Sequence, residues 1–289
     1  MAENGEYDSY TPENDMPPRY NAPLIAEWAG VQTLSRTRTK ESPEYNGHRI
    51  ASMELTENTP STLTTRANTL STGVYFRLIV FRKSGNNYVF QSAADYTSNG
   101  ASSPVLKKGK LLTRSGTIRV IGYSFNTTAA LGDIPASYTY NTTKIDIPNM
   151  NNDFMTYDSG DIANVNGLNY NLPVTFKQKL CKLTISISVT GFTSNAISGC
   201  TGVYVKQGGN STSWVIGSSA VAANTSNTAS FNPNTNQTTT IHMVPFASSR
   251  TITVHFNKLT VGNLIANNAD NIDIASTQSV QLKAGMRYT

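Results

Sequence analysis

KLTISISVT, residues 182–190, is the stretch that decides the fold. Its apolar residues alternate with Thr and Ser, and successive side chains of an extended chain point to opposite faces. The apolar set is Leu183, Ile185, Ile187 and Val189. This period of two predicts a β-strand with one buried face and one face in water.

The same period appears earlier, in GVYFRLIVFR, residues 73–82. It predicts a strand with Val74, Phe76, Leu78 and Val80 on one face and a less apolar set on the other. Residues 83–87, KSGNN, have turn chemistry, and YVFQ at 88–91 returns as a strand. Together these segments indicate a β-hairpin.

Further strands are predicted at short spacing along the chain, with polar loops between them and no convincing long helix. They lie in residues 117–127, 201–207, 214–217, 239–246 and 251–259. Residues 24–60 are ambiguous, because apolar residues near their start would share one face of a short helix, namely Leu24, Ile25, Trp28, Val31 and Leu34. We predict an all-β protein, with two β-sandwich domains in tandem of transthyretin-like or Greek-key type.

A length of 289 residues suits two domains or one large all-β domain. We expect a flexible acidic leader and N-terminal segment over residues 1–50, because the first 20 residues carry five acids and one base. The N-terminal sandwich is expected over 51–165 and the C-terminal sandwich over 166–289.

The composition favours an exported protein. Charged residues make up only 14% of the chain, with Thr, Ser and Asn abundant. The net charge of +5 is scattered, and no recognition helix or zinc spacing is present, so we expect no nucleic-acid partner. No apolar run is long enough for a membrane-spanning helix. We expect an export signal upstream of the polar start.

Residues that could carry chemistry are few. The histidines are His48, His242 and His255, and the last two are expected at exposed or half-exposed strand positions. Asp153, Asp158 and Asp161 are expected in one loop, where the Asp158–Asp161 spacing is a weak calcium pattern. No catalytic motif occurs. We therefore predict no enzyme activity, no catalytic residue, no cofactor and no metal.

Cys181 and Cys200 flank what is expected to be a hairpin or an adjacent strand pair. In an oxidising compartment they can form a disulfide. The alternative is that each is a small buried hydrophobic residue. The sequence leaves both readings open.

Several segments, taken in order, resemble one known family. TTRANTLSTGVYFRLIVFRKSGNNYVFQSAADYT (64–97) and SGTIRVIGYSFNTT (115–128) resemble the N-terminal domain of the fimbrillin-like proteins of the Bacteroidales. NDFMTYDSGD (152–161) and PVTFKQKLCKLTISISV (173–189) resemble the family's passage into its second domain. VQLKAGMRYT (280–289) resembles its final strand entry.

The resemblance implies two β-sandwich domains and export as a lipoprotein to the outer membrane surface. It also implies a pilus subunit, anchor or tip adhesin that assembles by β-strand addition. In the family's stalk subunits an arginine-specific protease removes an N-terminal strand. The matching position here is Arg66, with Arg36, Arg38 and Arg49 as competitors, and the alternative is that Arg66 is an ordinary surface residue.

The expected partners are other pilin subunits, the arginine-specific protease, and a host glycan or protein. Ending at Thr289 departs from the stalk pattern, because no extended C-terminal strand follows. An alternative function is a glycan- or host-binding surface lipoprotein that does not polymerise. A hydrolase is the least favoured alternative, because no constellation of catalytic groups is present.

Overall fold

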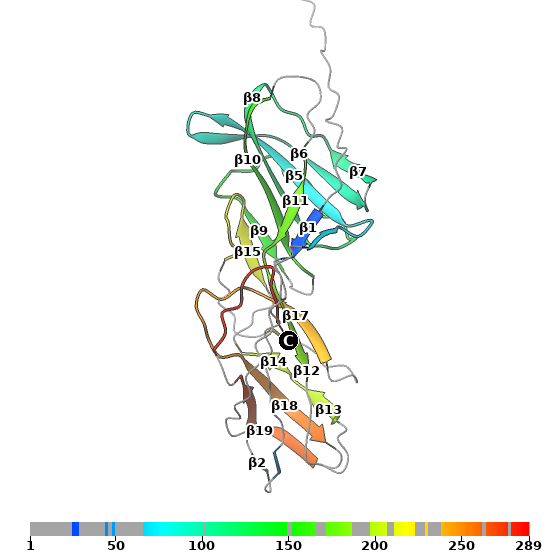
Figure 1. Cartoon of the computed structure of the whole chain (residues 1–289), viewed down its shortest axis with the longest axis vertical. Coiled ribbons are helices and arrows are strands. Elements are labelled where there is room, and N and C mark those ends of the chain that lie inside the picture. Colours follow the sequence, from blue (N-terminus) through cyan, green and yellow to red (C-terminus); the bar gives the residue numbers. More distant parts are fainter. Residues whose placement is uncertain are drawn as a thin grey trace, which may run out of the picture.

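The structure is a computed structural model of an elongated, all-β chain (Figure 1). It describes residues 25–28, 44–45, 48–49, 66–100, 102–148, 152–165, 172–186, 197–206, 211–222, 229–230, 238–261, 264–276 and 279–288. Every regular element in these ranges is a strand, so the predicted all-β class is confirmed. No helix in the described ranges is long and apolar enough to cross a membrane.

The largest element is an eight-stranded sheet, here called the large sheet. In spatial order its strands are β4 (Arg66–Thr69), β1 (Ile25–Trp28), β11 (Thr175–Gln178), β10 (Met155–Val165), β8 (Gly116–Ser124), β5 (Tyr75–Ser84), β6 (Asn87–Asn99) and β7 (Ser102–Gly109). The predicted hairpin of residues 73–91 is confirmed as β5 and β6. Residues 24–34, ambiguous in the sequence, contribute the strand β1.

Both faces of the large sheet are buried. Val74, Phe76, Leu78 and Val80 belong to one apolar cluster, as the alternation predicts. Ile79 and Phe81 belong to a second cluster on the opposite face. This second face also carries Arg77, so it is the less apolar of the two, as expected, but it is buried as well. Burial of each such Phe or Ile side chain stabilises the folded state by about 1.5–3 kcal/mol. The two clusters together therefore favour a sheet that is enclosed on both sides.

The remaining strands form smaller sheets. One contains β17 (Thr238–Met243), β12 (Cys181–Ser186) and β20 (Arg287–Tyr288). Another contains β13 (Ile197–Thr201), β18 (Thr253–Val261), β14 (Tyr204–Val205) and β16 (Ala229–Ser230), with β19 (Leu264–Ala275) also paired to β18. Two-stranded pairs are β2 (Glu44–Tyr45) with β3 (His48–Arg49), and β9 (Lys144–Ile147) with β15 (Thr212–Val215).

The alternation in residues 182–190 has the predicted consequence where it is described. Leu183 and Ile185 lie in a third apolar cluster, formed by residues of the second half of the chain, while Thr184 is half-buried and its hydroxyl bonds to that of Thr240. Ile187 and Val189 lie outside the described residues.

The two halves of the chain exchange strands. β11 follows residue 166 in sequence but belongs to the large sheet, and β15 pairs with β9 from the first half. Strand β15 lies beside β9 (Figure 1). Its Trp214 is almost fully buried against Tyr123 and Phe154. The tandem two-domain division stays a prediction, and residues 1–50 are described only at β1, β2 and β3.

Arg77 and Asp95 form an ion pair inside the molecule, and their side chains are only 2% and 4% exposed. Arg77 Nε and Nη2 donate to the two carboxylate oxygens at 2.5 and 2.8 Å. Nη1 donates to Tyr138 Oη and to the Asp133 carbonyl, and Nη2 also donates to the Gly132 carbonyl. All five guanidinium N–H groups are therefore used, which offsets the cost of removing the charge from water.

We predict that Arg77→Met lowers the free energy of unfolding by about 3–5 kcal/mol, because Asp95 is then left charged and buried. The double variant Arg77→Met/Asp95→Leu should recover most of this loss. Urea unfolding of the two variants and the parent protein measures the difference. A double variant that is no more stable than Arg77→Met would contradict this account.

Candidate functional site

The N-terminal strand β1 occupies an inner position in the large sheet. On one side it pairs in parallel with β11, from Ile25 opposite Thr175 to Glu27 opposite Lys177. On the other side it pairs antiparallel with β4, from Ile25 opposite Thr69 to Trp28 opposite Arg66. Both of its hydrogen-bonding edges are therefore occupied, although the strand has only four residues.

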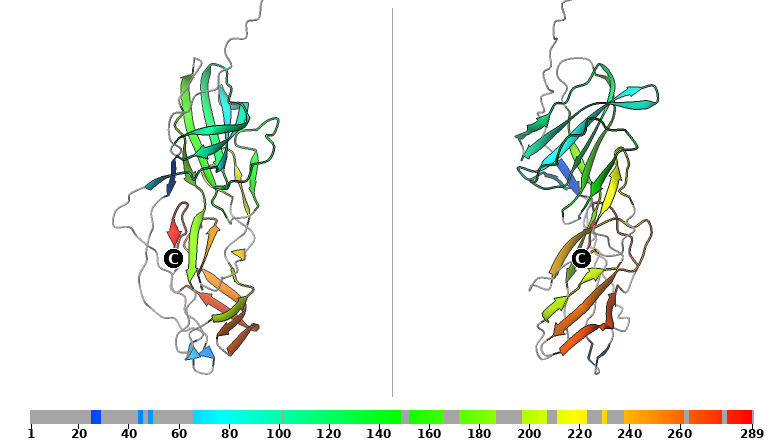
Figure 2. Two further views of the ribbon diagram at one scale, coloured as in Figure 1. Left: turned by 90° about the vertical axis from the view of Figure 1, so that its right-hand side faces the viewer. Right: turned by 180° about the vertical axis from the view of Figure 1, so that it is seen from behind.

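The neighbours of β1 come from distant parts of the sequence. β11 starts at residue 175, and the next described strands after β1, the β2–β3 pair, lie at the other end of the molecule (Figures 1 and 2). The chain returns to the large sheet only at β4. Strand β1 can therefore leave the sheet together with its flanking chain, while β11, β10, β8, β5, β6 and β7 keep their mutual pairing.

The position of β1 between β4 and β11 is here called the slot. Its β11 side is tightly packed. Phe176 lies on β11 and Val174 just before it. Both are almost fully buried in the first apolar cluster. The ring of Phe176 packs edge-on against Phe76 and Tyr157, at centroid distances of 5.5 and 6.3 Å. Such contacts hold β11 in place, and its outer edge is paired with β1.

The three residues that the sequence analysis named as possible sites, Arg66, Cys181 and Cys200, lie on three different strands. Arg66 is the first residue of β4, opposite Trp28, so it begins a strand rather than lying within a loop. Cys181 is a free cysteine, completely buried, and its Sγ bonds to the Met243 carbonyl oxygen. This fits the interpretation of Cys181 as a small buried hydrophobic residue. The side chain of Cys200, on β13, lies outside what is described, and cleavage at Arg66 stays a prediction.

A second feature is a β-bulge in β10 between Asp158 and Asp161. Asp158 lies opposite Ile121 and Asp161 opposite Arg119, so three steps along β10 match two along β8. Gly160 adopts a positive φ of 64°, which favours glycine, and the Ser159 hydroxyl accepts a bond from the Val120 N–H. The extra residue brings both carboxylates to the same face of the sheet.

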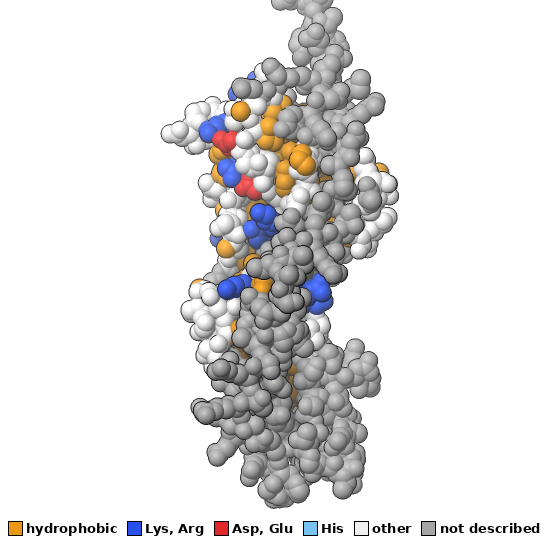
Figure 3. Space-filling model, viewed as in Figure 1, with side chains coloured by type: hydrophobic (Ala, Val, Ile, Leu, Met, Phe, Trp, Pro, Cys, Tyr) orange, Lys and Arg blue, Asp and Glu red, His pale blue; other side chains and the backbone are white. Residues whose placement is uncertain are grey.

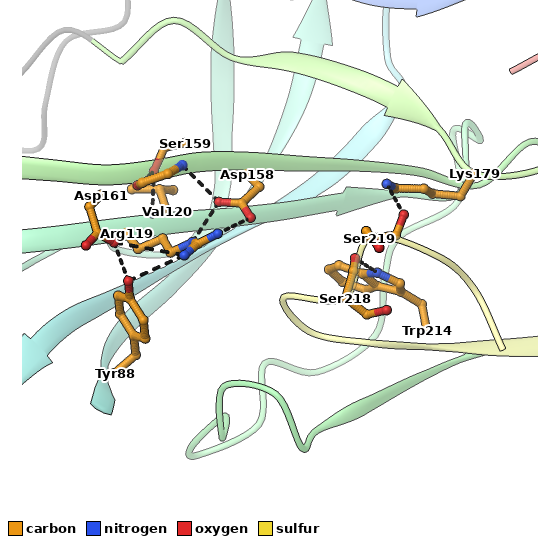
Figure 4. A network of polar contacts seen from close by, with 11 residues as sticks. Tyr88, Arg119, Val120, Asp158, Ser159, Asp161, Lys179, Trp214, Ser218 and Ser219 are labelled. Carbon is orange, nitrogen blue, oxygen red and sulfur yellow. Dashed lines mark hydrogen bonds and ion pairs between the residues drawn. The ribbon is translucent and has the colours of Figure 1, made fainter. Parts of the chain in front are cut away.

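The two carboxylates bind cations of the protein itself (Figure 4). Arg119 donates from Nε and Nη2 to Asp158 at 2.8 and 2.6 Å, and Lys83 Nζ donates to Asp161 at 2.6 Å. The Tyr88 hydroxyl also donates to Asp161. The guanidinium of Arg119 lies over the rings of Tyr88 and Tyr140. Figure 3 shows basic and acidic side chains side by side on this part of the surface.

The expectation that Asp158 and Asp161 lie in a loop was therefore wrong, because Gly160 at the bulge interrupts the alternation that marks a strand. Their oxygens are engaged by Lys83 and Arg119, whose positive charges disfavour a metal cation. The bonds to Lys83 and Tyr88 lower the pKa of Asp161. Among the described residues no group of three or more His, Cys, Asp or Glu side chains could hold a metal ion.

His255 was missed by the sequence analysis, which expected an exposed or half-exposed position. The side chain is buried, stacks on Tyr204 at 4.6 Å, and its Nδ1 lies 2.7 Å from Asp273 Oδ1. Asp273 also accepts a bond from Lys206. A His or Asp residue in a strand sequence is usually taken to face solvent. The pairing of His255 on β18 with Asp273 on β19 has no local signal in the sequence. His242 is half-buried, and His48 lies on β3.

No protein-family model matches the chain, and no curated protein matches it significantly. Several solved structures resemble it. The likeness is to fimbrial and cell-adhesion proteins. A candidate cell-adhesion protein of Bacteroides uniformis is 13% identical, with a TM-score of 0.46, covering 80% of this chain and 89% of its own.

A candidate cell-adhesion protein of Bacteroides fragilis is 12% identical, with a TM-score of 0.46, covering 93% of this chain and 90% of its own. A fimbrial assembly protein of Parabacteroides distasonis is 11% identical, with a TM-score of 0.41, covering 94% and 91%. These names belong to the same group of Bacteroidales proteins as the resemblance in the sequence. At these identities and scores the likeness transfers no role to any residue.

We predict that Arg119→Ala lowers the free energy of unfolding by about 1–2 kcal/mol. Arg119 links β8 to the bulge and covers two aromatic rings, and such contacts are worth about 0.5–1 kcal/mol each. Lys83→Ala is the matched control, since it removes a more exposed cation from the same network and should lower the stability less than Arg119→Ala does. Thermal and urea unfolding measure both variants, and equal losses would contradict the assigned role of Arg119.

Proposed function

We propose that this chain is a structural subunit or tip adhesin of a surface pilus and assembles by β-strand addition. The observation that carries the proposal is the position of β1, an inner strand of the large sheet that precedes Arg66 in sequence. Cutting the chain after Arg66 would detach β1 from the rest of the protein and leave β4 shortened by one residue. The slot between β4 and β11 would then be open for a strand of another subunit.

Physical chemistry favours refilling of such a slot. Removal of β1 leaves unpaired N–H and C=O groups along β11, beside the buried Val174 and Phe176. An unpaired edge of this kind binds an extended segment from another chain. The pairing of β1 sets the geometry of the incoming strand, which must run parallel to β11 and antiparallel to β4. A head-to-tail contact of this type does not close and so produces a filament.

The other end of the large sheet contrasts with this slot. β7 carries Pro104, Lys107 and Lys108, and its pairing with β6 contains two irregularities. Proline, lysine and bulges are the features by which edge strands avoid pairing with other chains. Strand addition is therefore favoured next to β11 rather than next to β7.

The resemblance in the sequence completes the proposal. It supports export to the cell surface as an outer-membrane lipoprotein and maturation by an arginine-specific protease at Arg66. It also supports other pilin subunits as partners, with a host glycan or protein bound at a tip. The role proposed is structural and adhesive, with no catalytic step.

The test is limited digestion with an arginine-specific protease, followed by mass spectrometry and size measurement. We expect a cut after Arg66 and the appearance of ordered oligomers, because the opened slot takes a strand from another copy. Arg66→Ala should abolish both results, while the matched control Arg49→Ala should leave both intact. An excess of the peptide PLIAEWAG, residues 23–30, should occupy the slot and suppress oligomers, and a scrambled peptide should not.

Two outcomes would contradict the proposal. If the protease cuts only at Arg36, Arg38 or Arg49, Arg66 is not the processing site. If the cut after Arg66 leaves a stable monomer, the chain does not polymerise by this route. The second result would favour the alternative function of a surface-exposed glycan- or host-binding lipoprotein.

A further inference from the structure

The edge strand β7 and the chain that follows it, residues 102–114, carry a concentration of positive charge. Their sequence, SSPVLKKGKLLTR, contains no acidic residue and four cations, which are Lys107, Lys108, Lys110 and Arg114. All four are exposed. The Cα atoms of Lys107 and Lys110 are at most about 11 Å apart, because three extended steps of the chain span no more. These four residues are here called the cationic edge.

The cationic edge is little neutralised by the described part of the protein. Within the described ranges the side chains of Lys107, Lys110 and Arg114 form no hydrogen bond or ion pair. Lys108 pairs with Asp133, but that carboxylate is 96% exposed. An ion pair so open to water contributes little, so a ligand anion can replace Asp133 as the partner of Lys108.

The backbone beneath the cationic edge is firmly held. Leu111 is buried in the first apolar cluster, and the N–H and carbonyl groups of Leu112 both bond to the Ser92 hydroxyl on β6. Gly109 has a positive φ of 75°, and a Cβ at this position would collide with the Ala93 carbonyl oxygen. The backbone is therefore ordered before any ligand arrives, and binding costs only the ordering of the long side chains.

The cationic edge offers side chains to a ligand, not a backbone edge. The proline and the irregular pairing of β7 oppose the addition of a strand. Apart from Pro104, every residue of β7 is exposed, including Val105 and Leu106 at 44% and 43%. A ligand that fits is an extended chain with repeated negative charges that lies along the edge.

The chemistry of residues 102–114 selects among such ligands. A nucleic-acid strand would need rings on which its bases stack, and the segment contains no aromatic residue and no histidine. An acidic protein would need an apolar interface core, and β7 exposes only Val105 and Leu106 as large apolar side chains. An anionic polysaccharide needs neither, because its sulfate or carboxylate groups bond directly to Lys and Arg.

We propose that the cationic edge binds an anionic polysaccharide, a glycan chain that carries sulfate or carboxylate groups along its length. The inference rests on the adhesive part of the proposed function, which it deepens by naming the class of glycan, and it requires no strand addition. In the large sheet β7 is the last strand at the end opposite β4 and β1 (Figure 1). A glycan bound there leaves the slot free.

The test measures binding of the uncut full chain to heparin oligosaccharides, which carry sulfate and carboxylate groups, by isothermal titration calorimetry. Neutral dextran is the control ligand and should not bind. Three to four charge contacts should make the affinity for heparin fall roughly twenty- to a hundredfold between about 50 and about 200 mM salt. If the wild type does not bind heparin at the lower salt concentration, the proposal is wrong.

A pair of triple variants separates this site from the general positive charge of the chain. Lys107→Gln/Lys108→Gln/Lys110→Gln should weaken binding by roughly tenfold or more. The matched control removes the same three charges from exposed lysines elsewhere and should bind like the wild type; it is Lys144→Gln/Lys258→Gln/Lys283→Gln. Equal losses in the two variants would overturn the proposal, because binding would then follow net charge alone.

Asp133→Asn is expected to act in the opposite direction. It keeps the backbone carbonyl that accepts a bond from Arg77 but releases Lys108 from its ion pair. Binding of heparin should become roughly two- to fivefold tighter. Unchanged or weaker binding would contradict the place of Lys108 in the site.

Two further ligands test the class of partner. Duplex DNA and vesicles that contain anionic lipid should both bind the wild type more weakly than heparin does. If either binds more tightly, and the Lys107→Gln/Lys108→Gln/Lys110→Gln variant loses that binding, the partner belongs to another class and the proposal is overturned. All these measurements use the uncut chain, so their failure is distinct from a failure to form oligomers after cleavage at Arg66.

Discussion

Burial of the large sheet on both faces is the constraint on which the rest of the structure depends. One apolar cluster contains Phe76 and Phe176, and the other contains Phe81, Phe154 and Trp214. A sheet enclosed in this way has only its edges left for backbone pairing with another chain. One edge strand, β7, is unsuitable for pairing, and the strand that is easiest to exchange, β1, lies near the other edge. The proposed route of assembly is consistent with this construction of the core, because it uses the strand next to the other edge.

The same constraint explains the buried charges. Arg77 lies on β5, between residues of the first cluster and next to those of the second, so its guanidinium cannot reach water. Asp95 on β6, the Tyr138 hydroxyl and the carbonyls of Gly132 and Asp133 together supply every acceptor that the guanidinium needs. A loop without regular structure is therefore bound to the sheet by Arg77, and Lys108 of β7 adds an ion pair with Asp133. Arg119 has a similar but more exposed role at the bulge of β10.

The sequence analysis predicted strands that depend on neighbouring residues. It missed pairings between residues that are far apart in the chain. Alternation correctly predicted β5 and β12, because the period of two depends only on neighbours in the chain. It could not show that β1 pairs with β11, since nearly 150 residues separate them. The bulge at Gly160 disguised β10, and the partner of His255 lies on the next strand. Asp153 lies outside the strands, as expected, but its burial has no local signal in the sequence.

Strand β11 connects the slot to the second half of the chain. Its outer edge pairs with β1, and its last residue, Gln178, lies beside Asp153. Only residues 179 and 180 separate β11 from β12, and Lys179 is tied at both ends, through its N–H to Phe154 and through Nζ to the Ser219 carbonyl. The connection is therefore too short and too well bonded to act as a flexible linker, and β11 and β12 are held close to one another by the same two residues.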